Sequence, residues 1–160
     1  MMRAGHHAVA AAGWLTLAPV LAPHAPAWQV AATTVVAGVT AAGKTSPDMD
    51  QRGVSAVVIP GGHRRVTHTV ELAVLVAVAG WLAPGIWWRA AAFGWASHVV
   101  ADAPFGGVPV AVLGMRRVGL RFKTGGPVEW VVAAGLTAWS VWLAAMLVPG
   151  VPEFVAALRG

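Results

Sequence analysis

The chain has 160 residues, of which 58% are hydrophobic and 11% are charged, and its formal net charge is +5. A typical soluble domain has roughly a quarter of its residues charged. The composition therefore favours one membrane-embedded domain, with a soluble all-α domain as the alternative. The absence of cysteine excludes disulfides and thiolate metal sites. The basic residues lie between apolar runs rather than along one helix face, which argues against a nucleic-acid partner.

Five short helices are predicted, separated by breaks rich in proline, glycine and polar residues. No Asp, Glu, Lys or Arg occurs between Arg3 and Lys44, and prolines divide this run in the middle. The expected helices cover about 6–22, 27–43, 68–83, 84–102 and 127–148, with loops at 44–66 and 103–126. They predict an all-α membrane helical bundle that forms a single integral-membrane domain over residues 1–160. Its transmembrane helices are slightly shorter than the ~20 residues of an average span.

Successive helices cross a bilayer in opposite directions, which brings the candidate site residues to one membrane face. The loop at 44–66, the end of helix 84–102 and the start of helix 127–148 all fall on the side of the N-terminus. Nine basic residues lie on that side, and Arg89 and Arg159 lie on the other. By the positive-inside rule, this face of the chain is expected in the cytoplasm, and the C-terminus is then expected outside.

Histidine and aspartate, two residue types that ligate metals, occur in close pairs at this face. His98 and Asp102 are four residues apart and share one helix face, although such a pair can also cap a helix end. His63 and His68 could bind one ion if His63 lies in the loop and His68 opens a helix that Thr67 caps. The alternative for this second pair is a solvated basic loop.

Two more acidic residues stand close together in the first loop. Asp48 and Asp50 flank Met49, and carboxylates two residues apart in a loop can point at neighbouring ions. The alternative is a simple turn, because Ser46-Pro47-Asp48 is also a common turn or helix-start signal.

Four further residues are candidates for the site. His6 begins the first helix and competes with His7 for the same role. Glu129 follows a proline at the start of the last helix, where it either stabilises the helix N-terminus or acts as a general base or extra ligand. Arg64 belongs to a basic group that could hold a phosphate or a lipid headgroup, or could only retain the loops in the cytoplasm. Glu129 and Arg64 are the candidate catalytic residues.

Taken in order, these motifs resemble the YdjM-like family of inner-membrane metal-dependent hydrolases, over about residues 5–130. The motifs are Gly5-His6, Pro47-Asp48-Met49-Asp50, Gly62-His63-Arg64-Arg65-Val66-Thr67-His68, Ser97-His98-Val99-Val100-Ala101-Asp102, Gly106-Gly107-Val108-Pro109 and Glu129. The resemblance favours His6 over His7. The metal ligands it implies are His6, Asp48, Asp50, His63, His68, His98 and Asp102. The chain departs from the family at Gln51, where many relatives carry His, and in its short loop between Asp50 and His63.

The sequence hypothesis is a membrane-bound metal-dependent hydrolase that cleaves an ester or phosphoester, lipids included, with metal-activated water. One or two divalent ions per chain are expected, with zinc as the first choice and manganese or iron as alternatives. The expected partner is the lipid bilayer. The rival hypothesis is a non-enzymatic metal-binding membrane protein with a structural or transport role, and the scarcity of polar residues at mid-span argues against transport.

Overall fold

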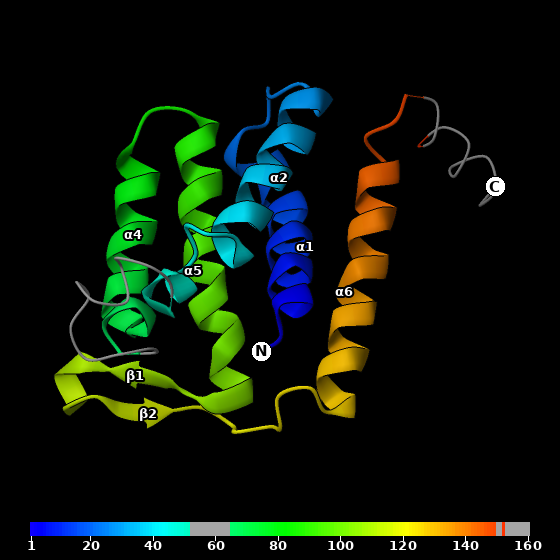
Figure 1. Cartoon of the computed structure of the whole chain (residues 1–160). Coiled ribbons are helices and arrows are strands. Elements are labelled where there is room, and N and C mark those ends of the chain that lie inside the picture. Colours follow the sequence, from blue (N-terminus) through cyan, green and yellow to red (C-terminus); the bar gives the residue numbers. More distant parts are fainter. Residues whose placement is uncertain (52–64, 150–151, 153–160) are drawn as a thin grey trace.

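The computed structural model describes residues 1–51, 65–149 and 152. The described chain is mostly helical, so the all-α part of the prediction is confirmed. Short 3₁₀ turns and one small hairpin connect the helices (Figure 1). The elements are α1 (Arg3–Leu21), α2 (Ala27–Ala42), η1 (Pro47–Gln51), η2 (Val66–His68), α4 (Val70–Leu82), α5 (Ile86–Gly106), β1 (Val108–Val110), η3 (Ala111–Leu113), β2 (Arg116–Val118) and α6 (Pro127–Ala145).

The helices lie side by side and run alternately up and down the bundle (Figure 1). α1 packs against α2, α5 and α6, while α5 also packs against α2 and α4. We call the end of the bundle at β1 and β2 the hairpin end. The starts of α1, α4 and α6 and the ends of α2 and α5 all point toward it, whereas the end of α6 lies at the opposite end.

Proline and threonine set two of the helix starts. Pro127 occupies the first turn of α6, where its missing N–H removes no helical hydrogen bond. Thr69 caps α4, because its side-chain oxygen accepts a hydrogen bond from the Leu72 N–H at 3.3 Å. The cap is therefore Thr69 instead of the expected Thr67. As a result His68 lies in η2, before α4, and not at the first position of the helix.

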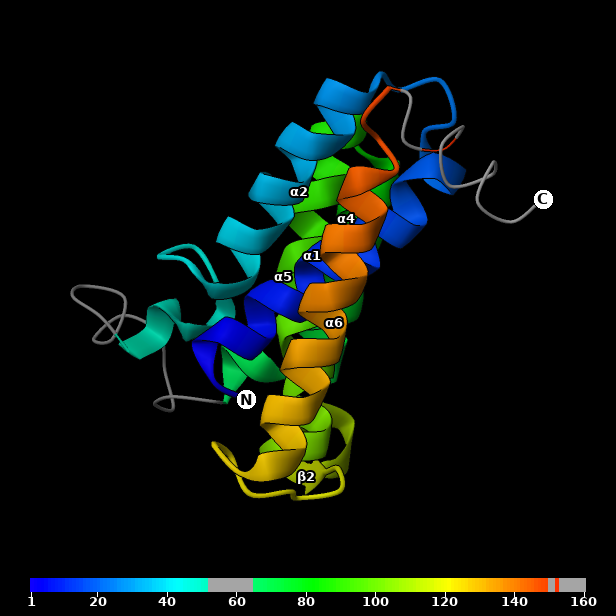
Figure 2. The same ribbon diagram turned by 90° about the vertical axis from the view of Figure 1, so that its right-hand side faces the viewer.

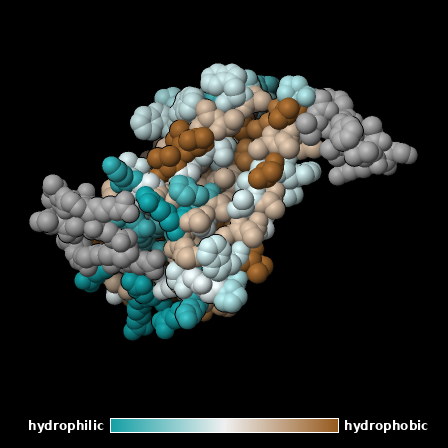
Figure 3. Space-filling view, turned by 45° about the vertical axis from the view of Figure 1, so that its right-hand side comes forward, coloured by the Kyte–Doolittle hydropathy of each residue, from teal (hydrophilic) through white to brown (hydrophobic). Residues whose placement is uncertain are grey.

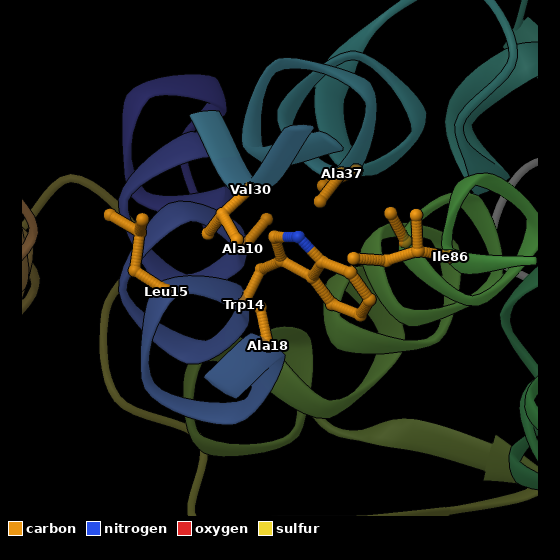
Figure 4. Close-up of a cluster of buried hydrophobic side chains, with 9 residues drawn as sticks. Ala10, Trp14, Leu15, Ala18, Val30, Ala37 and Ile86 are labelled. Atoms are coloured by element: carbon orange, nitrogen blue, oxygen red, sulfur yellow. The ribbon is translucent and has the colours of Figure 1, made fainter. Parts of the chain in front are cut away.

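The core between α1, α2 and the start of α5 is built on one large side chain among small ones. Trp14 is fully buried there (Figure 4), and its indole N–H donates to Thr33 Oγ1 at 2.9 Å. Small residues bring the helices close together, and a Cβ on Gly94 would lie 2.0 Å from the Ala37 carbonyl oxygen. This contact fixes α5 against α2, and the side chains of the site depend on both helices.

The segment 103–126, expected as a loop, contains the end of α5 and an antiparallel hairpin. α5 continues to Gly106, and Pro104 lies in its final turn without ending the helix. The helix stops at Gly107, whose φ of 72° suits glycine. β1 then pairs with β2, with Val108 opposite Val118. The proline therefore marks the last turn of this helix and not its boundary.

Glu71 ties the start of α4 to the hairpin. Its two carboxylate oxygens accept hydrogen bonds from the N–H groups of Ala111 at 3.0 Å and Val112 at 3.1 Å. These two hydrogen bonds stabilise the ionised form and lower the pKa of the Glu71 carboxyl. The residue precedes the apolar run of α4 and holds the hairpin across the lower end of that helix.

The outer surface of the bundle is apolar. α6 lies on the outside (Figure 2), and within it the buried residues are Glu129 and Ala133, while Val131, Trp139 and Val141 are exposed. Among the described residues, α6 is the one helix long and apolar enough to cross a membrane, and α2 and α4 are apolar but shorter. The described surface therefore leaves large hydrophobic side chains uncovered over several helices.

Candidate metal centre

Imidazole and carboxylate side chains from four separate elements meet near the hairpin end of the bundle. α1, η1 and η2 contribute one residue each, and α5 contributes two. The five residues, which we call the His/Asp cluster, are His6, Asp48, His68, His98 and Asp102. They form two groups of three that share His98, and the ligand atoms within each group lie within 4.8 Å of one another. This cluster can hold a metal ion.

α5 supplies the centre of the cluster. His98 and Asp102 lie one turn apart on the same helix face, with His98 Nε2 3.7 Å from Asp102 Oδ2. His98 is fully buried and Asp102 is 1% exposed. Burying a carboxylate and an imidazole on an apolar helix is costly unless other polar groups or a cation meet them. The remaining residues of the cluster provide these polar groups.

The first loop brings two residues to α5. His68 Nε2 lies 3.2 Å from His98 Nε2 and 3.3 Å from Asp48 Oδ1. Asp48 Oδ1 is in turn 3.7 Å from His98 Nε2, and His68 Nε2 is 3.8 Å from Asp102 Oδ2. η1 and η2 therefore present their side chains to the same small volume. Between η1 and η2, the structure does not describe residues 52–64.

His6 approaches from the first turns of α1. Its ring stacks on the ring of His98, with the centroids 3.7 Å apart and the planes 8° from parallel. His6 Nε2 lies 3.4 Å from Asp102 Oδ1, yet among the described residues neither ring nitrogen makes a hydrogen bond. A buried imidazole without hydrogen bonds is destabilising. A bound cation would remove this penalty.

Hydrogen bonds behind the cluster set which ring nitrogens face its centre. His98 Nδ1–H donates to the Ala41 carbonyl oxygen at 2.6 Å, and His68 Nδ1 lies 3.0 Å from Thr67 Oγ1. The Nε2 atoms of both rings are therefore left to point at each other. They lie 3.2 Å apart. His98 Nδ1 carries the ring proton, so His98 Nε2 presents a lone pair, and either a proton on His68 Nε2 or a metal ion can lie between the two nitrogens.

The spacing of the cluster fits a metal ion of ordinary size. Six nitrogen–nitrogen and nitrogen–oxygen separations within it range from 3.2 to 3.8 Å, and the ligand atoms of each group of three lie within 4.8 Å of one another. Tetrahedral ligands at ~2.0–2.1 Å from an ion such as zinc lie about 3.3 Å from each other. The donor set of imidazoles and carboxylates suits a divalent ion, and the structure carries no argument for one metal over another.

Access to the cluster is one-sided. The side chains of His6, His68, His98 and Asp102 are at most 2% exposed, whereas that of Asp48 is 32% exposed. Asp48 is therefore the cluster residue nearest to solvent, while its cluster-facing oxygen, Oδ1, is itself buried. The other sides are closed by α1, α5 and η2.

Not every predicted ligand can be compared with the structure. Asp50 lies in η1, but its side chain is not among those described, and His63 and Arg64 lie outside the described residues. His7 is exposed, whereas its neighbour His6 is buried in the cluster. The five remaining ligand candidates are the residues that the fold brings together.

Glu129 contacts backbone groups at the start of two helices. The carboxylate is fully buried, and it accepts hydrogen bonds from the Met2 N–H and, at 2.8 Å, from the Gly125 N–H. The Met1 amino group next to it lies 2.5 Å from Asp102 Oδ1. Glu129 thus connects the start of α6 to the segment that precedes His6.

Sequence reasoning missed several groups that orient the cluster. The Ala41 carbonyl, which accepts from His98, is a backbone group and leaves no sequence signal. The sequence reasoning also missed the role of Arg3. Its Nε–H donates to the Ala42 carbonyl at 2.7 Å and so joins α1 to the end of α2. The Thr67 hydroxyl beside His68 was predicted as a helix cap. Its position next to a candidate ligand was the one sequence feature that could have indicated its contact with the His68 ring.

No family model, curated protein or solved structure matches the chain.

Proposed function

We propose that the protein is a membrane-bound metal-dependent hydrolase that cleaves an ester or phosphoester. The observation that carries the proposal is the convergence of three imidazoles and two carboxylates, from four elements, in a buried cluster with one partly exposed member, Asp48. Imidazole–carboxylate sets with one open side are typical of catalytic metal sites. The resemblance of the sequence to the YdjM-like family points in the same direction and stays a prediction.

The apolar surface supports the membrane part of the proposal. A soluble monomer rarely exposes hydrophobic patches as extensive as those on α2, α4 and α6. Polar side chains gather instead toward the lower part of the molecule (Figure 3). The described basic residues at the hairpin end are Arg3, Lys44, Arg65, Arg116, Arg117, Arg121 and Lys123, against Arg89 at the other end. We therefore place the hairpin end in the cytoplasm and the helices in the inner membrane.

The number of metal ions that the His/Asp cluster can bind depends on the lone pairs that its ligand atoms offer. His98 Nδ1–H is used by Ala41, so His98 has one lone pair and ligates one ion. The described donors thus form one complete site. A second ion requires the carboxylates of Asp48 and Asp102 to bridge, or further ligands from Asp50 and His63. We propose one ion on the described donors and a second only with those additions.

A divalent ion in this cluster would act as a Lewis acid and lower the pKa of bound water. The chain itself holds the donors in place and excludes bulk water from all sides except that of Asp48. The contacts of Glu129 support a positioning role, because they hold the segment that carries His6. The general-base role expected for Glu129, and the phosphate-binding role expected for Arg64, stay predictions.

Burial also favours a second candidate function, a structural metal site. Four of the five side chains are almost fully enclosed, as in sites that only stabilise a fold. In that case removing the metal lowers the thermal unfolding midpoint, and the metal-loaded protein turns over no substrate. The catalytic proposal expects the same loss of stability together with chelator-sensitive hydrolysis.

Metal analysis of the detergent-purified protein tests the cluster first. We expect at least one divalent ion per chain, and a loss of most of it in His98→Ala and Asp48→Ala, because each removes a ligand. His7→Ala is the matched control and should keep its metal, since His7 is the exposed neighbour of His6. Equal metal content in all four proteins would contradict the site.

Hydrolysis is then tested with a panel of soluble phosphodiesters, carboxylic esters and lipid esters. The proposal expects turnover of at least one class, abolished by chelation and by His98→Ala and unaffected by His7→Ala. Full metal occupancy without turnover on any class would support the structural site instead.

A further inference from the structure

An apolar groove of about 530 Å³ lies on the outer surface between α2, α4 and α5. α4 contributes Val76 and Ala79 to its walls, Ala83 follows the end of α4, and α5 contributes Trp88 and Trp95. The small alanine side chains leave space between the helices, and the indole rings give the groove apolar walls. Its volume falls within the ~300–1,000 Å³ typical of small-ligand sites.

On α5, the groove and the His/Asp cluster lie on the same helix face. Trp88, Ala91 and Trp95 line it at steps of three and four residues, and the next two steps reach His98 and Asp102. Residues at such steps share one helix face. Along this face, the groove thus ends about one helical turn, ~5.4 Å, from the first candidate ligand.

The two helices beside α5 show the same continuity. Thr40 of α2 lines the groove, and the next residue, Ala41, accepts the hydrogen bond from His98 Nδ1. η1, with Asp48, follows the end of α2, and η2, with His68, precedes the start of α4. η1 and η2 thus lie at the hairpin ends of the two helices, α2 and α4, that flank the groove.

We propose that this groove binds the acyl chain of a lipid whose ester or phosphoester group reaches the His/Asp cluster. The inference rests on the proposed function and names the substrate class for it. Its physical basis is the match between a two-part ligand and a two-part surface. A long apolar chain fits the groove, and the polar group at its end meets the imidazoles, the carboxylates and the exposed side of Asp48.

A neighbouring apolar groove does not have this continuity. It lies on the other side of α4 and is lined by Val74, Ala77 and Val100. Val99 and Ala103, next to His98 and Asp102, also line it, but no residue of α2 or η1 does. A lipid chain in this second groove would therefore lie beside α4, α5 and β1, away from η1 and Asp48. The second groove therefore serves as an internal control.

Two substitutions on α4 separate the grooves. Ala79→Trp fills the proposed groove and Ala77→Trp fills the other one, and both alanines are exposed, so the bundle accommodates either indole. The probe is phosphatidic acid that carries a photoreactive diazirine on one acyl chain, bound in detergent micelles. The readout is the labelled peptide.

We expect saturable labelling of the α4 and α5 peptides that line the groove. Displacing about two methylene groups from the groove costs about tenfold in affinity, so labelling in Ala79→Trp should fall about tenfold. Labelling in Ala77→Trp should be unchanged, and all proteins should keep their metal. Equal labelling in both variants, or labelling spread evenly over α4 and α6 as expected for bulk lipid, would overturn the inference.

Lipid labelling and metal content are measured separately. Failure of this inference can therefore be distinguished from failure of the proposed function. If Ala79→Trp loses groove labelling but the wild-type protein hydrolyses no ester, the lipid site is supported and the hydrolase proposal is overturned. If hydrolysis is found, Ala79→Trp should raise KM for a long-chain ester about tenfold and leave turnover of a short-chain ester unchanged. If the wild-type protein and Ala79→Trp have the same KM for the long-chain ester, the groove is not the acyl-chain site.

Discussion

Single residues in this protein show how a buried polar group is positioned by its neighbours. His68 and His98 each use Nδ1 for a hydrogen bond to a nearby oxygen, and this leaves Nε2 directed into the cluster. Such partners of metal-binding histidines typically change metal affinity 10–100-fold when they are removed. The prediction at this scale therefore concerns a residue beside a ligand as well as the ligands themselves.

Thr67→Val keeps the shape of the side chain and removes the hydroxyl that lies 3.0 Å from His68 Nδ1. We expect metal affinity, measured by competition with a chromophoric chelator, to fall by about 10–100-fold because His68 loses its orienting partner. Thr45→Val is the control, since Thr45 is exposed in the same connection between α2 and α4. An unchanged affinity in Thr67→Val would show that the ring is held by other contacts.

Glu129→Gln tests whether Glu129 positions the start of α1. The glutamine amide would place an NH₂ group against the N–H of either Met2 or Gly125, and one buried hydrogen bond would be lost. We expect the free energy of unfolding to fall by about 1–3 kcal/mol, seen as a lower thermal midpoint in detergent. Metal content per folded chain should not change. A wild-type midpoint combined with loss of hydrolysis would indicate the general-base role instead.

At the scale of elements, the packing of α5 against α2 decides the geometry of the cluster. Gly94 lets α5 approach so closely that a Cβ there would lie 2.0 Å from the Ala37 carbonyl oxygen. One turn further along each helix, His98 meets the Ala41 carbonyl at 2.6 Å. A change in the helix spacing therefore changes both the packing and the hydrogen bond that orients His98.

Gly94→Ala is expected to force these two helices apart. Overpacking of this kind costs about 1–3 kcal/mol, so the thermal midpoint should fall, and metal affinity should fall with it. Gly135→Ala on α6 is a matched control, because nothing lies within 4 Å of a Cβ at that position. It should gain up to about 1 kcal/mol from better helix propensity. Equal midpoints for the two variants would contradict the close α2–α5 contact.

Helix positions could be predicted from the sequence more accurately than the connections between them. The charge-free runs and prolines placed five helices, and α2 and α6 begin at the predicted positions 27 and 127. The hairpin was missed because its strands have three residues each, too few for a period-two pattern. The cap of α4 was misplaced because Thr67 and Thr69 carry the same signal, and only the hydrogen bond to Leu72 distinguishes them.

At the scale of the whole molecule, the bundle separates charge from apolar surface along its length. Candidate ligands and most described basic residues lie toward the hairpin end, while the sides of the bundle expose valine, leucine and tryptophan. This division supports the proposed membrane location. In the proposed orientation, the acyl groove would lie beside hydrocarbon and the His/Asp cluster beside the headgroups.

Single-cysteine labelling tests this orientation without background, because the chain has no cysteine. Leu120 is 73% exposed at the hairpin end, and His24 lies in the exposed turn at the other end. In spheroplasts, a membrane-impermeant maleimide should label His24→Cys and not Leu120→Cys, and lysis should expose both positions. Labelling of Leu120→Cys before lysis would reverse the orientation, and protection of both positions would place the whole chain inside the cell.

Composition and local spacing by themselves determined the helical class of this protein and the approximate extent of its helices. They also determined the shared face of His98 and Asp102, because a separation of four residues on a helix leaves no other arrangement. These properties depend on neighbours within a few positions along the chain, which a sequence displays directly.

Only the tertiary structure decided which distant groups meet. His6 stacks on His98 across 92 positions of sequence, and the Ala41 carbonyl selects the ring nitrogen that faces the cluster. The tertiary structure also decided that Glu129 accepts hydrogen bonds from the Met2 and Gly125 N–H groups. The physical reason is that such contacts depend on how closely whole helices pack. That spacing is set by small side chains such as Gly94, far from any residue that carries the chemistry.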